Sequence, residues 1–184
     1  MNRPIRVLQL TTALRGSAFF NNLYSYFDPE QVVSVFATFT EAGEFSAQLE
    51  ERGATVYKLG VTKNGPTVEW LELLKAYRPL SKIIEDEEID IIHPHLLFPT
   101  ILGVSVAKIK KTKSVFSRHH SDSSHVLASP IKRKFYLTLE HILNRSADHI
   151  IAPSKTVREI LTAKENVSPD KVSVIPYGQV FERF

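Results

Sequence analysis

Five of the seven histidines in this 184-residue chain lie in two short segments, each directly after an apolar run. His93 and His95 belong to DIIHPH, and SRHHSDSSH holds His119, His120 and His125. Imidazole titrates near neutral pH and exchanges hydrogen bonds with phosphates and hydroxyl groups. Residues i and i+2 of an extended chain share a face, so the first pair can face one crevice. If the two preceding strands are neighbours, all five rings surround one pocket.

A glycine near the amino terminus is a second candidate ligand contact. Gly16 lies between a predicted strand at Ile5–Thr12 and a predicted helix at Phe19–Phe27. Glycine lets the backbone approach a ligand, and the start of a helix offers unpaired N–H groups to phosphate. A tight turn without a ligand is the alternative. The sequence has no GxGxxG and no GxxxxGK[ST] motif, which disfavours dehydrogenase-type dinucleotide binding and a P-loop nucleotidase.

Strand-type and helix-type segments alternate along the chain, and these candidate residues follow strands. The predicted strands are Ile5–Thr12, Val32–Thr40, Thr55–Leu59, Asp90–His93, Ser114–Arg118, Asp148–Ala152 and Lys171–Ile175. The predicted helices are Phe19–Phe27, Glu44–Arg52, one that begins near Pro66 and is kinked or divided at Pro79, Thr100–Lys110, Pro130–Ser146 and Lys155–Lys164. Alternation of this kind predicts a doubly wound, Rossmann-like α/β domain, with about seven parallel strands and helices on both faces. Ligands of such sheets bind at the carboxyl ends of the strands.

Length and composition fit one globular domain, residues 1–184. Because the chain has no cysteine, disulfides, thiolate nucleophiles and cysteine zinc sites are excluded. The net charge of +3 is too small to demand a polyanion, so no nucleic-acid partner is expected. The longest apolar stretch, Leu96–Ala107, is too short to span a bilayer, and the first residues do not resemble a signal peptide. A cytoplasmic location is therefore predicted.

Four segments together resemble the amino-terminal half of a family 4 glycosyltransferase of the GT-B fold. IRVLQLTTALRGSAFFNNL is similar to the family's first strand, loop and helix, and DIIHPHLLFPTILG to its "aspartate, two apolar residues, histidine, x, histidine" segment. SVFSRHHSDSSH resembles the strand whose terminal histidine faces the active cleft, and VSPDKVSVIPYG the approach to the interdomain hinge. The chain departs from the family at Gly16, where a Gly-Gly pair is usual, and at Gln179, where the hinge aspartate is expected.

The resemblance implies transfer of a sugar from a nucleotide-sugar to a hydroxyl group, with retained configuration and without an obligatory metal or other cofactor. His119 would be the catalytic residue that contacts the donor, and Gly16 would bring the first loop near its phosphates. The other implied substrate-site residues are His93, His95, His120 and Asp122. The acceptor would be a carbohydrate or a lipid-linked molecule. Family members carry a second domain with most of the donor contacts, so this carboxyl-terminal domain is expected to be missing and the chain inactive alone.

Two functions of other classes stay open. His93 and His95, with His119 or His120, could supply three nitrogen ligands in a metal-dependent hydrolase, although Leu96 and the residue after it replace the aspartate of an HxHxDH site. The chain could also be a sugar-binding domain without catalytic activity.

One helical segment suggests a further partner. Ile131–Leu137 mixes basic and aromatic residues, as a helix that binds a membrane surface can. The favoured interpretation is an ordinary amphipathic helix that packs on the sheet. Peripheral contact with a membrane is the alternative.

Overall fold

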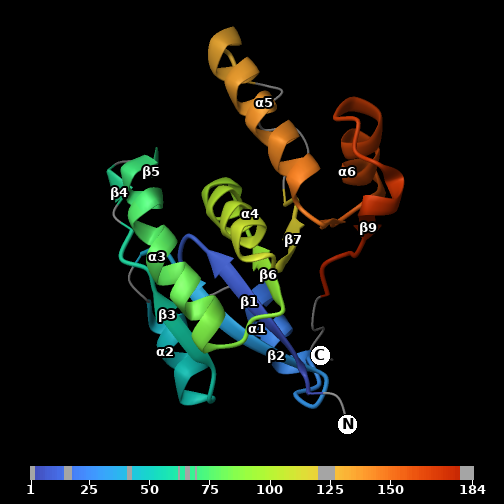
Figure 1. Cartoon of the computed structure of the whole chain (residues 1–184). Helices are drawn as coiled ribbons and strands as arrows, with labels where there is room; N and C mark the ends of the chain where they lie inside the picture. Colours follow the sequence, from blue (N-terminus) through green and yellow to red (C-terminus); the bar gives the residue numbers. More distant parts are fainter. Residues whose placement is uncertain are drawn as a thin grey trace.

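The computed structural model has a seven-stranded parallel sheet at its centre (Figure 1). It describes residues 3–14, 18–40, 43–61, 63–64, 67–68, 70–119 and 127–178. In spatial order the strands are β3 (Thr55–Lys58), β2 (Val32–Thr38), β1 (Ile5–Thr11), β6 (Ile91–Pro94), β7 (Lys113–Ser117), β8 (His149–Ala152) and β9 (Val172–Val174). Every neighbouring pair is parallel. The order runs outward from β1 to β3 and then from β6 to β9, so the switch point lies between β1 and β6.

Helices cover both faces of this sheet, which confirms the predicted doubly wound fold. They are α1 (Ala18–Tyr26), α2 (Glu44–Glu51), α3 (Trp70–Asp86), α4 (Leu97–Lys110), α5 (Pro130–Ser146) and α6 (Lys155–Glu159). A π-helical turn, Ile160–Lys164, continues α6, and a short 3₁₀ turn, Pro169–Lys171, precedes β9. Among the described residues, no helix is long and apolar enough to cross a bilayer.

The two faces of the central strands have different partners. Leu8, Leu10 and Ile92 are fully buried in the aliphatic core that α3 and α4 share with the sheet. A Cβ added at Gly103 in α4 would lie 3.2 Å from Leu10 Cδ2 and from Pro94 Cβ. The missing side chain therefore lets α4 lie directly against β1 and β6. On the opposite face, α1 and α2 bury a smaller core on β2.

Three predictions about helices are corrected. The helix predicted to begin near Pro66 begins at Trp70 (α3); Pro66 itself lies outside the described residues, and Thr67–Val68 (β5) pairs antiparallel with Lys63–Asn64 (β4). Of the two alternatives at Pro79, the division into two helices is wrong, since α3 is one helix of 17 residues; the kink stays a prediction. The Pro79 ring is on the exposed side, and buried Leu73, Ala76 and Leu80 hold the turns around it. Finally, α4 begins at Leu97 rather than Thr100, because a proline is tolerated in the first helical turn.

Candidate functional site

The carboxyl ends of β6 and β7 bring three of the predicted site residues together. The ring centroids of His93 and His95 are 4.3 Å apart, and those of His95 and His119 are 5.3 Å apart. A bridge between His95 and Ser117 extends the pairing of the two strands beyond their last regular residues. The site lies beside the switch point of the sheet, where doubly wound folds bind ligands.

The remaining predicted site residues are not covered by these observations. Gly16, His120 and Asp122 lie outside the described residues. Their proximity to the histidines stays a prediction.

A hydrogen-bonded chain joins four side chains of the site. His95 Nε2 lies 2.9 Å from Gln9 Oε1, and His95 Nδ1 lies 3.1 Å from His119 Nε2. His119 Nδ1 in turn contacts the Tyr177 hydroxyl through a short hydrogen bond. These residues come from β1, from the segments after β6 and β7, and from the segment after β9.

The acceptor at one end sets the direction of this chain. Gln9 Oε1 can only accept, so His95 Nε2 carries the proton and its Nδ1 accepts from the Nε2–H of His119. The Tyr177 hydroxyl can donate to His119 Nδ1 or accept from it. In this arrangement His95 is neutral, and His119 and His95 each donate toward Gln9.

Burial keeps two of the histidines uncharged. Loss of hydration, with a smaller contribution from the neighbouring His119, lowers the pKa of His93 to about 3. Burial also holds the pKa of His95 well below its usual value, with smaller contributions from His93 and His119. At neutral pH these two rings position other groups and carry no charge.

Helix α1 supplies an aromatic wall that holds the cluster. The Phe19 ring meets the rings of His95, His119 and Tyr177 edge to face, at centroid distances of 5.3, 5.5 and 5.4 Å. One turn along, Asn22 Nδ2 donates to the Gly178 carbonyl over 2.9 Å. The segment that carries Tyr177 is therefore fastened to α1.

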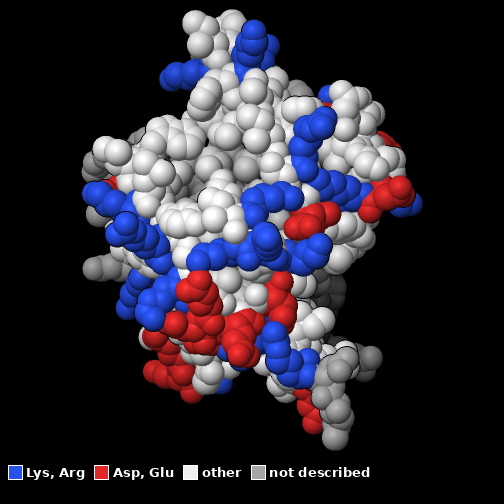
Figure 2. Space-filling view, in the orientation of Figure 1, with Lys and Arg blue, Asp and Glu red and all other residues white. Residues whose placement is uncertain are grey.

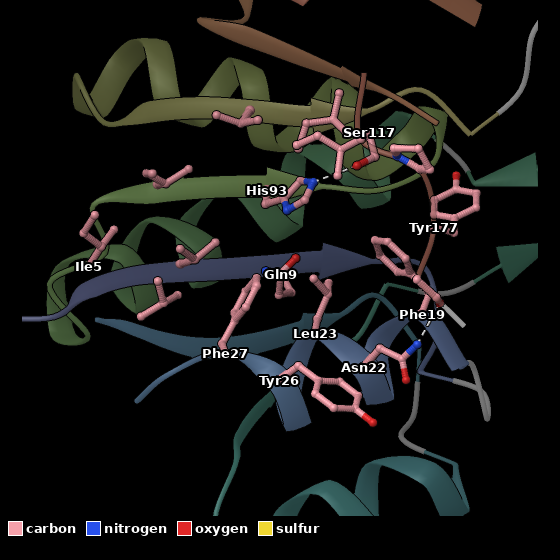
Figure 3. Close-up of a pocket in the computed structure, with 18 residues that line it drawn as sticks. Ile5, Gln9, Phe19, Asn22, Leu23, Tyr26, Phe27, His93, Ser117 and Tyr177 are labelled. Carbon is pink, nitrogen blue, oxygen red and sulfur yellow. Dashed lines mark hydrogen bonds between the residues drawn. The ribbon is translucent and has the colours of Figure 1, made fainter. Parts of the chain in front are cut away.

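An apolar trough of about 740 Å³ continues from this cluster along the same sheet face (Figure 3). Its floor is formed by Val7, Ile91, Val115 and Ile151, one from each of four neighbouring strands. Helix α1 forms one wall, and residues 175–178 form another. The polar end holds Gln9, His93 and Ser117, and His93 Nε2 lies 2.9 Å from Ser117 Oγ. The trough can take an apolar group whose polar end meets these side chains.

The charged groups beside His119 pair with one another. Arg118 Nη2 lies 2.9 Å from Glu140 Oε2 and 3.0 Å from Glu165 Oε1. Asn144 Nδ2 donates to the other oxygen of Glu165. All four are largely buried, and the arginine is positioned by two carboxylates, which makes this cluster a structural ion-pair network.

A metal site needs three or more ligand side chains around one point. The described residues contain no group of three or more His, Asp or Glu side chains placed to hold a metal ion. Both ring nitrogens of His95 are hydrogen-bonded to other side chains. His120, a ligand in the hydrolase alternative, lies outside the described residues.

The sequence alone did not identify Gln9, Phe19, Ser117 or Tyr177 as part of the site. A polar Gln9 within the apolar run IRVLQL was a usable signal, because its neighbours Leu8 and Leu10 are core residues. Tyr177 belongs to the IPYG segment, whose family resemblance indicates the approach to a hinge and does not indicate a site residue.

Comparison with solved structures shows a shared fold. Anabaena HepE in complex with UDP and glucose superposes with a TM-score of 0.70 at 18% identity, over 95% of this chain and 45% of that one. A putative UDP-N-acetylglucosamine 2-epimerase from Listeria monocytogenes gives 0.68 at 14% identity, over 93% and 45%. Acinetobacter baumannii MurG gives 0.63 at 11% identity, over 97% and 47%. The chain thus spans less than half the length of these proteins.

Sequence comparison adds the family. No curated protein matches the chain. The model for Glycosyltransferase Family 4 matches residues 31–180, which include β6, β7 and the IPYG segment. With most of its length matched, the chain belongs to glycosyltransferase family 4.

Proposed function

We propose that the chain is the acceptor-side domain of a retaining glycosyltransferase, which moves a sugar from a nucleotide-sugar to a hydroxyl group of a carbohydrate or lipid-linked acceptor. Family membership supports this function, as does the solved complex of HepE with UDP and glucose. The observation that carries the proposal is the position of His119, held by His95 and Tyr177 at the carboxyl end of β7.

The chemistry asks for a hydrogen-bond donor at the leaving group. Negative charge develops on the diphosphate as the bond to the sugar breaks, and a fixed donor stabilises it. The Nε2–H of His119 already points to His95, so Nδ1 is the atom available to a phosphate once the Tyr177 hydroxyl gives way. A nearby diphosphate favours the protonated ring, because opposite charges attract. His119 would then donate from Nδ1, and no metal is needed in this scheme.

Transfer would require a second domain. The solved relatives of this fold are about twice as long as the chain, and GT-B enzymes act by closing two halves over the substrates. We therefore expect the isolated chain to be inactive, with His93, His95, His120, Asp122 and Gly16 forming one wall of a divided site.

The test restores the second half. The chain is joined to a family 4 carboxyl-terminal domain and incubated with UDP- and GDP-sugars and a panel of hydroxyl acceptors, and release of the nucleotide is measured. His119→Ala should lower kcat by about 10²- to 10³-fold, the usual loss when one oxyanion donor is removed. His141→Ala is the control, since that ring is exposed on α5. Full activity of His119→Ala would refute the assigned role.

A further inference from the structure

Exposed apolar side chains gather where the first turn of α3 meets the second turn of α5. Here the α3–α5 surface means Trp70, Leu71 and Leu74 of α3 together with Ile131 and Phe135 of α5. Leu71 is 66% exposed, Leu74 71% and Ile131 83%, values unusual for large aliphatic residues. The rings of Trp70 and Phe135 are 6.3 Å apart, so the two helices present one continuous surface.

Helical periodicity shows that this surface is an organised face. Ile131 and Phe135 are four residues apart on α5, and exposed Ile142 continues the same stripe. The buried side of α5 is a different one, formed by Glu140, Leu143 and Asn144. The helix therefore packs on the domain through one face and leaves a second apolar face uncovered.

Basic residues border the apolar side chains. Lys132 and Lys134 are exposed beside Ile131 and Phe135, and residues 130–139 contain no Asp or Glu. The first acidic residue of α5, Glu140, is buried against Arg118. Figure 2 shows Lys and Arg side chains at the upper tip of the molecule above a broad uncharged area, while most acidic side chains gather lower down.

We propose that the α3–α5 surface docks the domain on an anionic lipid bilayer. Tryptophan, phenylalanine and leucine side chains of an amphipathic face insert between headgroups, and neighbouring lysines bind anionic lipids. Helix α5 follows β7, and its amino-terminal end projects beyond the sheet on the side of the carboxyl edge, the edge that also holds His119 (Figure 1). The bilayer would therefore lie beside the candidate site. This inference does not depend on the proposed sugar transfer.

Vesicle flotation tests the proposal directly. The whole chain is mixed at low salt with vesicles of equal parts phosphatidylcholine and phosphatidylglycerol, or of phosphatidylcholine alone. It should float with the anionic vesicles, more weakly with the neutral ones, and progressively less as salt screens the lysines. Lys132→Glu and Lys134→Glu should each weaken binding by about fivefold or more, the contribution of one lysine near such a surface.

Matched substitutions distinguish vesicle binding through the α3–α5 surface from non-specific adsorption of the protein. The double variant Leu71→Ser, Leu74→Ser should lose flotation at all salt concentrations, because it removes the inserted groups. Ile109→Ser on α4 and Lys164→Glu in the π-helical turn after α6 should float like the parent, since both change exposed side chains outside the α3–α5 surface. All substituted side chains are exposed, and circular dichroism and thermal melting verify that each variant folds.

Three outcomes would overturn the proposal. One is no flotation of the parent at low salt, and another is equal binding by the surface variants and the controls. The third is a dimer, detected by light scattering, that the leucine double variant abolishes while anionic vesicles fail to bind the parent. That result would assign the surface to a second copy of the chain.

Discussion

The buried histidine His93 makes the stability of the domain sensitive to mild acid. Burial lowers its pKa to about 3, whereas an unfolded histidine has a pKa of about 6.5. Between these values the unfolded chain binds one more proton than the folded one, so the free energy of unfolding decreases as the pH falls. The stability is fully present above about pH 6.5 and is lost toward pH 3. His95, whose pKa burial also lowers, adds an effect of the same sign.

The size of the effect follows from the linkage relation. One extra proton in the unfolded state changes the free energy of unfolding by about 1.4 kcal/mol per pH unit. Because the His93 transition begins near pH 6.5, this residue alone should cost about 2 kcal/mol between pH 7 and pH 5. Asp90 and Asp148 do not contribute to the change in the free energy of unfolding between pH 7 and pH 5, since interactions in the fold hold the pKa of both below 3.8.

Urea unfolding of the parent and of His93→Gln at several pH values between 7 and 5 measures this contribution. Glutamine keeps a polar group near Ser117 but does not titrate, so the stability difference between the two proteins should shift by about 2 kcal/mol in favour of the variant as the pH falls. His141→Gln, which changes an exposed ring, should follow the parent. An identical pH dependence for the parent and His93→Gln would show that His93 is not buried in its neutral form.

Three other outcomes test the packing and the hydrogen bonds. Ile92→Ala should cost about 2–5 kcal/mol in urea unfolding because its side chain is fully buried, whereas Ile91→Ala, in the open trough, should cost about 1 kcal/mol or less. Arg118→Ala should cost about 3–5 kcal/mol in the same assay because it removes the arginine that both buried carboxylates contact. Nitrogen NMR at neutral pH should find the His95 proton on Nε2, and Tyr177→Phe should shift the resonance of His119 Nδ1, which is hydrogen-bonded to the Tyr177 hydroxyl. A His95 proton on Nδ1 would reverse the assigned direction of the hydrogen-bonded chain.

The fold could be predicted because its signals are local. Short β-branched runs alternate with helical segments, and each predicted strand has a counterpart in the sheet within two residues at either end. The family resemblance rested on the order of four segments, and the match over residues 31–180 confirms it. The helix is not divided at Pro79, because a proline on the exposed side of a long helix removes one backbone hydrogen bond while the buried side keeps the helix intact.

The site was only partly predictable because its contacts are long-range. The spacing of His93 and His95 places both on one face of a strand, and the structure has both there. Their partners are distant in sequence: Gln9 is 86 residues from His95, and Tyr177 is 58 residues from His119. These pairings depend on the order of β1, β6 and β7 in the sheet and on the path of the chain after β9, which no local pattern specifies.

The register of β6 is what joins stability to chemistry in this domain. Ile92 points into the aliphatic core with α3 and α4, while His93 and His95 point to the face that α1 lines. A shift of one residue would exchange the two faces, because side chains alternate along a strand. The histidines would then enter an aliphatic core without Gln9 or Ser117 as hydrogen-bond partners, and Ile92 would face the polar end of the trough. Both the burial of unpaired histidines and the exposure of Ile92 disfavour the shifted register. The core that stabilises β6 therefore also positions His95, the imidazole that contacts His119.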